Sequence, residues 1–199
     1  MTARVVLASL SESRKIMLRA AGVAFEAAAP DVDEDALKRA LLAKGAGTSA
    51  LAQALADAKA LGVRGAVHDA LVLGADQILD CGGRIFGKVA SQDEARATLR
   101  ALKGRTHRLI SAAALARNGE IVWRHSDSAE LSMREFSGAF LESYLTAEGE
   151  AILGSAGCYR IEGRGAQLFE RVSGDYFTIR GLPLLNVLAA LRDLGALAR

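Results

Sequence analysis

The chain has 199 residues, of which 51% are hydrophobic, and its formal net charge is +2. This length and apolar content suffice for one sizeable core, and the interspersed charges exclude an extended nucleic-acid-binding surface. Cys81 and Cys158 have no metal-ligand spacing, which favours free thiols in a reducing compartment. The apolar run at residues 5–8 is too short for a signal-peptide core or a membrane span, so we expect a cytoplasmic protein.

The apolar run at residues 5–8 predicts a buried strand, followed by a serine-rich turn at 9–13 and a helix that ends at Gly22. A strand, a turn and a helix N-terminus form a natural anion site, because free N–H groups and the helix dipole point at the turn. Arg14 is disfavoured by that dipole, so we expect it to have an anionic partner. Ordinary capping of the helix by the serines is the alternative interpretation.

Acidic residues dominate positions 31–35, at the start of a second predicted helix. A glycine-containing break at 45–47 separates this helix from a third, over residues 50–61, which we expect Thr48 or Ser49 to cap. The glycine spacing at the break matches a dinucleotide-binding fingerprint. The preceding residues continue a helical pattern instead of forming a strand, so an NAD-type oxidoreductase is disfavoured.

A short β-rich apolar run begins at Leu71, and the chain then presents Gly74, Asp76 and Gln77. This pattern predicts a buried strand that stops near Gly74 and whose end delivers a carboxylate to a sheet edge. Lys88 follows a second short apolar segment after a hairpin turn. A carboxylate and an ammonium held near each other suit a metal-chelated phosphate, and a turn aspartate with a solvated lysine is the alternative.

The Asn118-Gly119 dipeptide lies between two apolar runs and predicts a β-hairpin. The many small residues at 154–163 would let the backbone approach a ligand, although a bulged edge strand gives the same pattern. His107 has no nearby partner in the sequence and is expected to be a packing residue. Further helices are predicted after the capping residues Ser91 and Ser137 and over residues 184–197.

Short motifs are spread in order along nearly the whole chain. They are LAS-x-S-x-x-R at 7–14, VDE at 32–34, A-x-x-KA at 56–60, GADQ at 74–77, GK at 87–88, GRTH at 104–107, GSAG-x-Y-x-I-x-G at 154–163 and GLP at 181–183. Together they resemble the Maf family of nucleoside triphosphate pyrophosphatases. Val89 departs from the Gly-Lys-Pro sequence usual in that family.

The resemblance implies an α/β fold like that of the inosine-triphosphate pyrophosphatases, with a mixed twisted sheet and flanking helices forming two lobes around a central cleft. It implies a single domain over residues 1–199, a homodimer, and a divalent metal, magnesium or manganese. The implied reaction is hydrolysis of a nucleoside triphosphate to the monophosphate and diphosphate. The alternative is a nucleotide-binding regulator of cell division or septum formation that does not turn its ligand over.

The resemblance also assigns roles to residues at matching positions. Asp76 matches the proton acceptor and, with Glu34, the metal ligands. The other matching residues are Lys59, Lys88 and Glu34 for catalysis, and Ser9, Ser11, Ser13, Arg14, Gln77 and Glu162 for substrate binding. These residue types suit the reaction, because cations offset the charge that builds on phosphoryl oxygens and a carboxylate takes the proton of the attacking water.

Three of these positions match the family's base pocket. The branch acting on dTTP and UTP usually has Arg, Thr and Gln there, and the 7-methyl-GTP branch has Trp, Gln and Glu. Gln77 and Glu162 favour the second branch, whereas Ser13 fits neither. Since a carboxylate can pair with the N–H donors of guanine or with a cationic methylated base, we expect a modified guanine nucleotide as substrate.

Overall fold

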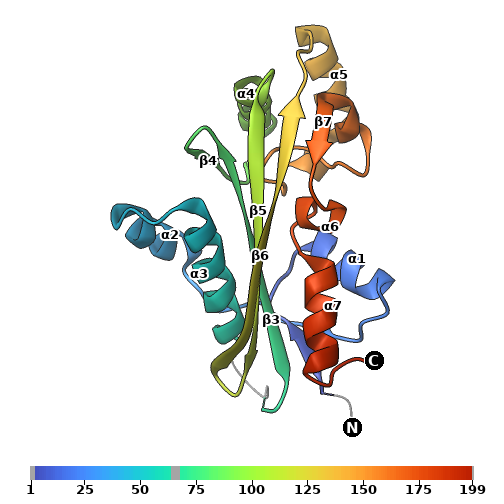
Figure 1. The fold of residues 1–199 in the computed structure, drawn as a ribbon. Coiled ribbons are helices and arrows are strands. Elements are labelled where there is room, and N and C mark those ends of the chain that lie inside the picture. Colours follow the sequence, from blue (N-terminus) through green and yellow to red (C-terminus); the bar gives the residue numbers. More distant parts are fainter. Residues whose placement is uncertain (1–2, 64–67, 199) are drawn as a thin grey trace. The chain divides into compact units, whose positions relative to one another are not determined.

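The computed structural model describes residues 3–63 and 68–198. Its centre is a seven-stranded sheet with the order β2-β1-β3-β5-β6-β7, and β4 pairs with β3 (Figure 1). β1 pairs in parallel with β2 and β3, whereas the β3–β4 and β6–β7 pairs are antiparallel. The strands are β1 (Val5–Leu7), β2 (Glu26–Ala27), β3 (Leu71–Cys81), β4 (Arg84–Phe86), β5 (Thr106–Arg117), β6 (Glu120–Met133) and β7 (Phe169–Ser173). The predicted mixed α/β class is therefore confirmed.

The chain divides into two compact units. Unit 1 comprises Met1–Gln77, Ile110–Asp127 and Tyr176–Arg199, and unit 2 comprises Ile78–Leu109 and Ser128–Asp175. Three strands, β3, β5 and β6, contribute residues to both units. Each unit is thus assembled from segments that are distant in the sequence.

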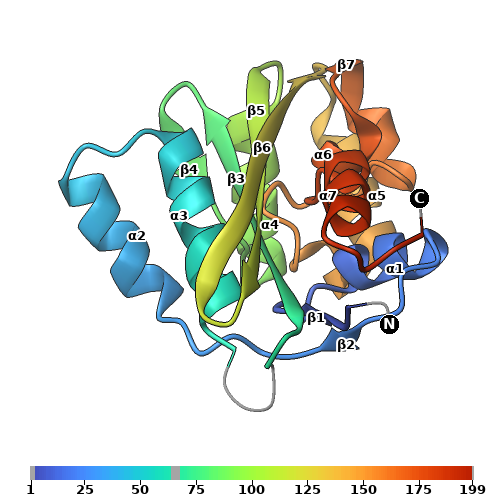
Figure 2. The ribbon, with the colours of Figure 1, turned by 60° about the horizontal axis from the view of Figure 1, so that its bottom comes forward.

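Unit 1 places its helices on two sides of its strands, with α2 and α3 on one side and α1 and α7 on the other (Figures 1 and 2). Its helices are α1 (Glu12–Ala20), α2 (Glu34–Ala43), α3 (Thr48–Leu61), α6 (Tyr176–Ile179) and α7 (Leu184–Asp193). One apolar cluster joins β1, α1, β3, β5 and α7, and it includes Leu7, Leu18, Leu73, Leu115 and Val187. This packing fixes the segments that carry most of the predicted site.

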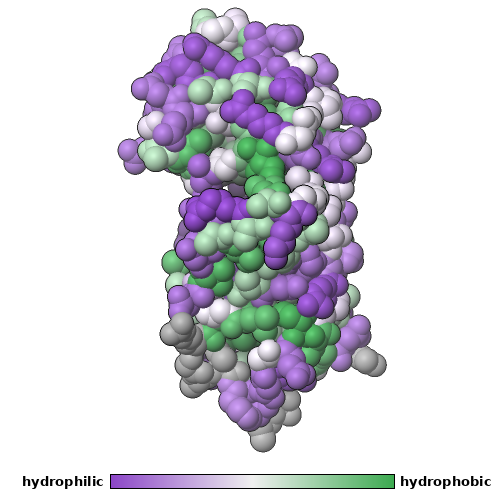
Figure 3. Space-filling model, turned by 90° about the vertical axis from the view of Figure 1, so that its left-hand side faces the viewer, coloured by the Kyte–Doolittle hydropathy of each residue, from purple (hydrophilic) through white to green (hydrophobic). Residues whose placement is uncertain are grey.

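Helix α2 is an exception, because none of its side chains is buried. On the face of the molecule that carries α2, hydrophilic residues lie beside hydrophobic ones (Figure 3), and Leu42 is 47% exposed. The helix starts at a good N-cap, where Asp33 accepts a hydrogen bond from the Ala36 N–H at 2.9 Å. Capping and contact with α3 therefore stabilise α2, and a fully buried face does not.

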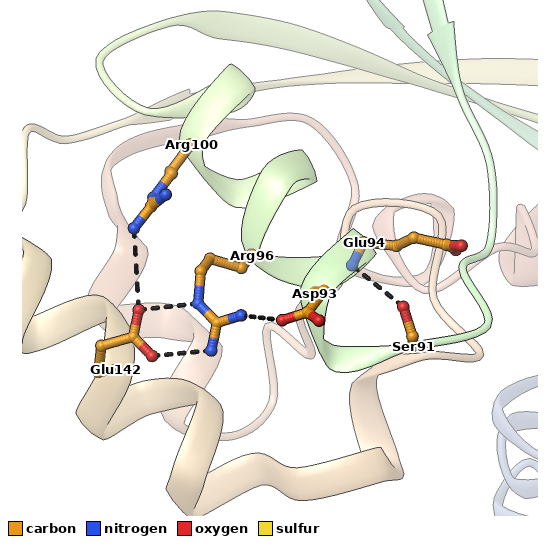
Figure 4. Close-up of polar contacts among 6 residues, drawn as sticks. All are labelled: Ser91, Asp93, Glu94, Arg96, Arg100 and Glu142. Carbon is orange, nitrogen blue, oxygen red and sulfur yellow. Dashed lines mark hydrogen bonds and ion pairs between the residues drawn. The ribbon is translucent and has the colours of Figure 1, made fainter.

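Unit 2 holds α4 (Gln92–Leu102) and α5 (Gly138–Glu148), together with short 3-10 helices at Gly149–Ile152 and Arg164–Leu168. An ion cluster links α4 to α5 (Figure 4). The guanidinium of Arg96 donates two hydrogen bonds to Glu142, at 2.8 and 2.9 Å, and a third to Asp93. The hydrogen bonds from Arg96 to Glu142 lower the pKa of Glu142.

A buried aromatic group also lies in unit 2. His107 is 2% exposed, and its Nε2 lies 2.7 Å from the hydroxyl of Tyr159. Burial lowers the pKa of His107 to about 4, so the ring is neutral at pH 7. The predicted packing role of His107 is confirmed, and so are the free thiols of Cys81 and Cys158, both of which are buried.

Most predicted turns and caps are confirmed, with errors at some helix ends. Asn118 and Gly119 have φ angles of 51° and 82°, as a two-residue hairpin turn requires. The expected capping of the third helix was wrong, because Thr48 is its first residue and Gly47 is the N-cap. The last helix ends at Asp193 instead of residue 197. Within the described residues, no helix is long and apolar enough to cross a bilayer.

Candidate active site

Asp76 lies in the middle of β3, so the prediction that the strand stops near Gly74 was wrong. Gly74 has a packing role instead. A Cβ atom there would lie 2.2 Å from the Ala56 carbonyl oxygen and 2.4 Å from the Ala60 nitrogen. Because glycine has no Cβ, the backbone of α3 approaches β3 closely at this point. Lys59, the neighbour of Ala60, is thereby brought to Asp76.

One ammonium joins two carboxylates in unit 1. Lys59 Nζ lies 2.7 Å from Asp76 Oδ1 and 2.9 Å from Glu34 Oε2. The side chains of Lys59 and Asp76 are each only 9% exposed. The other carboxylate oxygen, Asp76 Oδ2, is buried and has no hydrogen-bond partner within the described parts of the chain. This group therefore carries one excess negative charge and an oxygen with unused lone pairs.

Arg14 supplies a second buried cation. It is 8% exposed, and it donates hydrogen bonds to the Gly181 carbonyl at 2.9 Å and to the Ser9 hydroxyl at 3.2 Å. Burial lowers the pKa of Arg14, and the charges of Asp76 and Glu34 counteract that effect. The two carboxylates thus act on Arg14 through their charge, whereas the hydrogen bonds described for it go to a carbonyl and a hydroxyl, so a direct anionic partner stays a prediction.

The serines of the first turn do not cap α1 with their side chains, as the alternative interpretation had it. Ser11 is the N-cap residue, but its side chain makes no capping hydrogen bond. Ser9 instead accepts a hydrogen bond from the Ser11 N–H at 3.2 Å, and Ser13 donates to the Arg180 carbonyl at 3.0 Å. The serine side chains are therefore tied to the turn and to a distant segment of unit 1.

Gln77 follows Asp76 on β3 and is anchored through its amide nitrogen. Nε2 lies 3.0 Å from Ser111 Oγ and from the carbonyl oxygens of Thr178 and Ile179. Ser111 and Thr178 were not predicted as site residues. Ser111 lies in an apolar run that predicts a strand of a hairpin, and no local motif singles out the polar atoms of either residue. Gly181 was recognised only as the first residue of the GLP motif, and no role was predicted for it.

The predicted site residues divide between the two units. Unit 1 holds Ser9, Ser11, Ser13, Arg14, Glu34, Lys59, Asp76 and Gln77. Unit 2 holds Lys88 and Glu162. The structure brings together Glu34, Lys59 and Asp76, and also Ser9 and Arg14. The roles of Lys88 and Glu162 at this site stay predictions.

Comparisons with known proteins identify the family of the chain. Residues 4–194 match the family model of Maf-like proteins. A "Nucleoside triphosphate pyrophosphatase" from Caulobacter vibrioides is 52% identical, with 97% of this chain and 96% of that protein aligned. A "7-methyl-GTP pyrophosphatase" from Rhizobium meliloti is 48% identical, with 97% of each chain aligned. A relative from Granulibacter bethesdensis, named "Nucleoside triphosphate pyrophosphatase", is 45% identical over 98% of each chain. The chain therefore belongs to the Maf family.

Proposed function

We propose that this protein is a nucleoside triphosphate pyrophosphatase, a hydrolase that splits a nucleoside triphosphate into the monophosphate and diphosphate. The observation that carries the proposal is the buried Lys59 ammonium, which bridges Asp76 and Glu34 within unit 1. The names of relatives at 45–52% identity support the same reaction. A site that only bound nucleotide would not require a buried carboxylate with an unpaired oxygen.

The described side chains suit attack of water on a phosphoryl group. Negative charge builds on the phosphoryl oxygens during the attack, and the cations Arg14 and Lys59 offset it. Asp76 Oδ1 is engaged by Lys59, which leaves Oδ2 to accept the proton of the attacking water. Diphosphate is a good leaving group and needs no strong acid.

A divalent metal fits this donor set. Carboxylate oxygens are the ligands that magnesium and manganese prefer, and Asp76 and Glu34 would hold the ion. When bound, such an ion supplies charge neutralisation for the phosphates and lowers the pKa of a coordinated water. Magnesium commonly binds through one or two carboxylates together with substrate phosphates, so two protein carboxylates are sufficient.

A modified guanine nucleotide, such as 7-methyl-GTP, is the substrate that we favour. Gln77 and Glu162 match the branch that acts on this nucleotide. Of the three relatives described above, the one from Rhizobium meliloti is named "7-methyl-GTP pyrophosphatase", whereas the other two are named "Nucleoside triphosphate pyrophosphatase". Serine has no aromatic ring, so Ser13 offers no surface on which a base would stack; its hydroxyl donates to the Arg180 carbonyl instead. We further propose a cytoplasmic homodimer that acts on free nucleotides, with neither a nucleic acid nor a membrane as partner.

A substrate screen tests the function. The purified protein is incubated with canonical and methylated nucleoside triphosphates plus magnesium or manganese, and released diphosphate is measured. We expect release from at least one nucleotide, and a purified Asp76→Asn variant gives the contamination background. No release above that background would refute the enzyme. Tight binding of a triphosphate without product over hours would instead favour the regulator of cell division.

A further inference from the structure

Four consecutive backbone carbonyls in unit 1 accept hydrogen bonds from side chains of the proposed site. They belong to residues 178–181, at the C-terminal end of α6 and in the turn after it, and we call them the carbonyl row. Gln77 donates to the first two, Ser13 to the third and Arg14 to the fourth. The Thr178 carbonyl also accepts the Gly181 N–H at 3.0 Å, and side-chain donors are well suited to complete the carbonyls at a helix C-terminus.

The carbonyl row fixes which end of the Gln77 amide faces it. The carbonyl oxygens of Thr178 and Ile179 can only accept, so the amide must turn its nitrogen toward them. Ser111 donates its own proton to the Thr178 carbonyl at 2.8 Å and is therefore an acceptor for Gln77. Gln77 Oε1 takes part in none of these bonds and is the atom that the amide can offer to a ligand.

Gly181 gives the carbonyl row its shape. Its φ is +97°, a conformation that residues with a Cβ rarely adopt. A Cβ at this position would lie 3.7 Å from both Arg14 Nη2 and Gln77 Oε1. Gly181 therefore lies next to both the guanidinium of Arg14 and the amide of Gln77.

We propose that the carbonyl row and Ser111 are the positioning elements of the active site. The row holds Arg14 and Ser13 in place and, together with Ser111, fixes the Gln77 amide with its oxygen toward the ligand. Gly181 and Ser111 act through these side chains and touch no substrate themselves. This inference rests on the proposed function, since it assumes that Arg14 and Gln77 contact the nucleotide.

A pair of glycine variants tests the carbonyl row. Gly181→Ala forces an alanine into a left-handed conformation beside Arg14, and Gly195→Ala does so after α7, where a Cβ would meet nothing within 4 Å. We expect both variants to lose similar thermal stability. Only Gly181→Ala should lower kcat/KM, by roughly 10- to 100-fold, because small displacements of binding groups are costly. Equal activity in the two variants would overturn the proposal.

A double-mutant cycle tests Ser111. If Ser111 acts through Gln77, Ser111→Ala raises KM about fivefold in the wild-type background and has no further effect in the Gln77→Ala background. Additive effects of the two substitutions would show that Ser111 has only a structural role. An unchanged KM in Ser111→Ala would also contradict its assignment as a positioning residue.

The same variants separate this inference from the proposed function. If the wild-type protein releases no diphosphate, the dissociation constant of a non-hydrolysable α,β-methylene triphosphate is measured by calorimetry. Weaker binding by Gly181→Ala than by Gly195→Ala would support the positioning role even though the enzymatic function had failed. If the wild-type protein neither hydrolyses nor binds triphosphates, both proposals are overturned.

Discussion

At the scale of single residues, Asp76 is set apart by having one oxygen bound to Lys59 and the other without a partner in the described residues. A buried polar atom without a hydrogen bond is costly and calls for an explanation, such as a ligand that supplies the missing contact. Lys59 is also paired with Glu34 at 2.9 Å, so we expect it to keep an anionic partner when the charge on Asp76 is removed. Function and stability can therefore be separated at this residue.

We expect Asp76→Asn to reduce kcat by roughly 10²- to 10⁴-fold, because the general base is lost. The melting temperature should stay within about 5 °C of wild type, because the asparagine keeps the size and one acceptor of the carboxylate. Asp80→Asn is the matched control on the same strand, where Asp80 accepts from the Gly83 N–H. Unfolding of Asp76→Asn at room temperature would mean that Asp76 is structural.

His107 makes the stability of the protein depend on pH. Its pKa is lowered to about 4 in the folded state by burial, from 6.5. Between pH 6.5 and about pH 4, the unfolded chain therefore binds a proton at His107 that the folded chain does not bind. The free energy of unfolding is therefore not reduced by His107 above pH 6.5. It falls by up to about 3 kcal/mol as the pH falls toward 4.

His107→Gln should remove this pH dependence while it keeps a polar partner for Tyr159. Urea denaturation at several values between pH 7.5 and 4.5 gives the free energy of unfolding of both proteins. We expect wild type to lose more stability than the variant over this range. His68→Gln removes a histidine whose side chain is 85% exposed and serves as the control. Parallel curves for wild type and His107→Gln would contradict the assignment.

At the scale of elements, α2 is the helix that depends most on its own ends. It carries Glu34 at its first position and buries none of its side chains. Its Asp33 cap, together with the contact of α2 with α3, helps to hold Glu34 near Lys59. Global stability should be insensitive to this helix, whereas the geometry of the site should respond to it.

Asp33→Ala should destabilise the start of α2 by about 1 kcal/mol, because the Ala36 N–H loses its acceptor. We expect kcat/KM to fall about fivefold with little change in melting temperature. Asp33→Asn also caps helices well and should keep wild-type activity. Equal losses in the alanine and asparagine variants would show that the charge of Asp33, and not its cap, is what matters.

Local patterns predicted elements better than they predicted contacts. The Asn118-Gly119 hairpin and the Ser137 cap follow from short-range turn and capping chemistry, and both are confirmed. Gly74 was misread because its role depends on α3, a helix that a local pattern cannot place beside β3. The carbonyl row at residues 178–181 escaped prediction for a related reason. Every residue has the same backbone carbonyl, so the sequence does not indicate which carbonyls accept hydrogen bonds from distant side chains.

At the scale of the whole molecule, the path of the chain links the two units. The chain passes from one unit to the other after Gln77, Leu109, Asp127 and Asp175, so unit 2 is formed by two insertions into unit 1. β3, β5 and β6 continue through these boundaries without interruption. A strand that loses its pairing in one unit loses support in the other, which predicts cooperative unfolding.

Two natural probes can test this cooperativity. The single tryptophan, Trp123, packs against the core of unit 1, whereas Cys81 and Cys158 are buried in unit 2. Tryptophan fluorescence and pulsed thiol labelling in urea should therefore give the same midpoint.

Leu99→Ala in unit 2 and Leu55→Ala in unit 1 each empty a fully buried position and should cost about 2–5 kcal/mol. Because the strands are shared, each substitution should shift both probes equally; a Leu99→Ala variant that shifted thiol labelling alone would show that the units unfold independently.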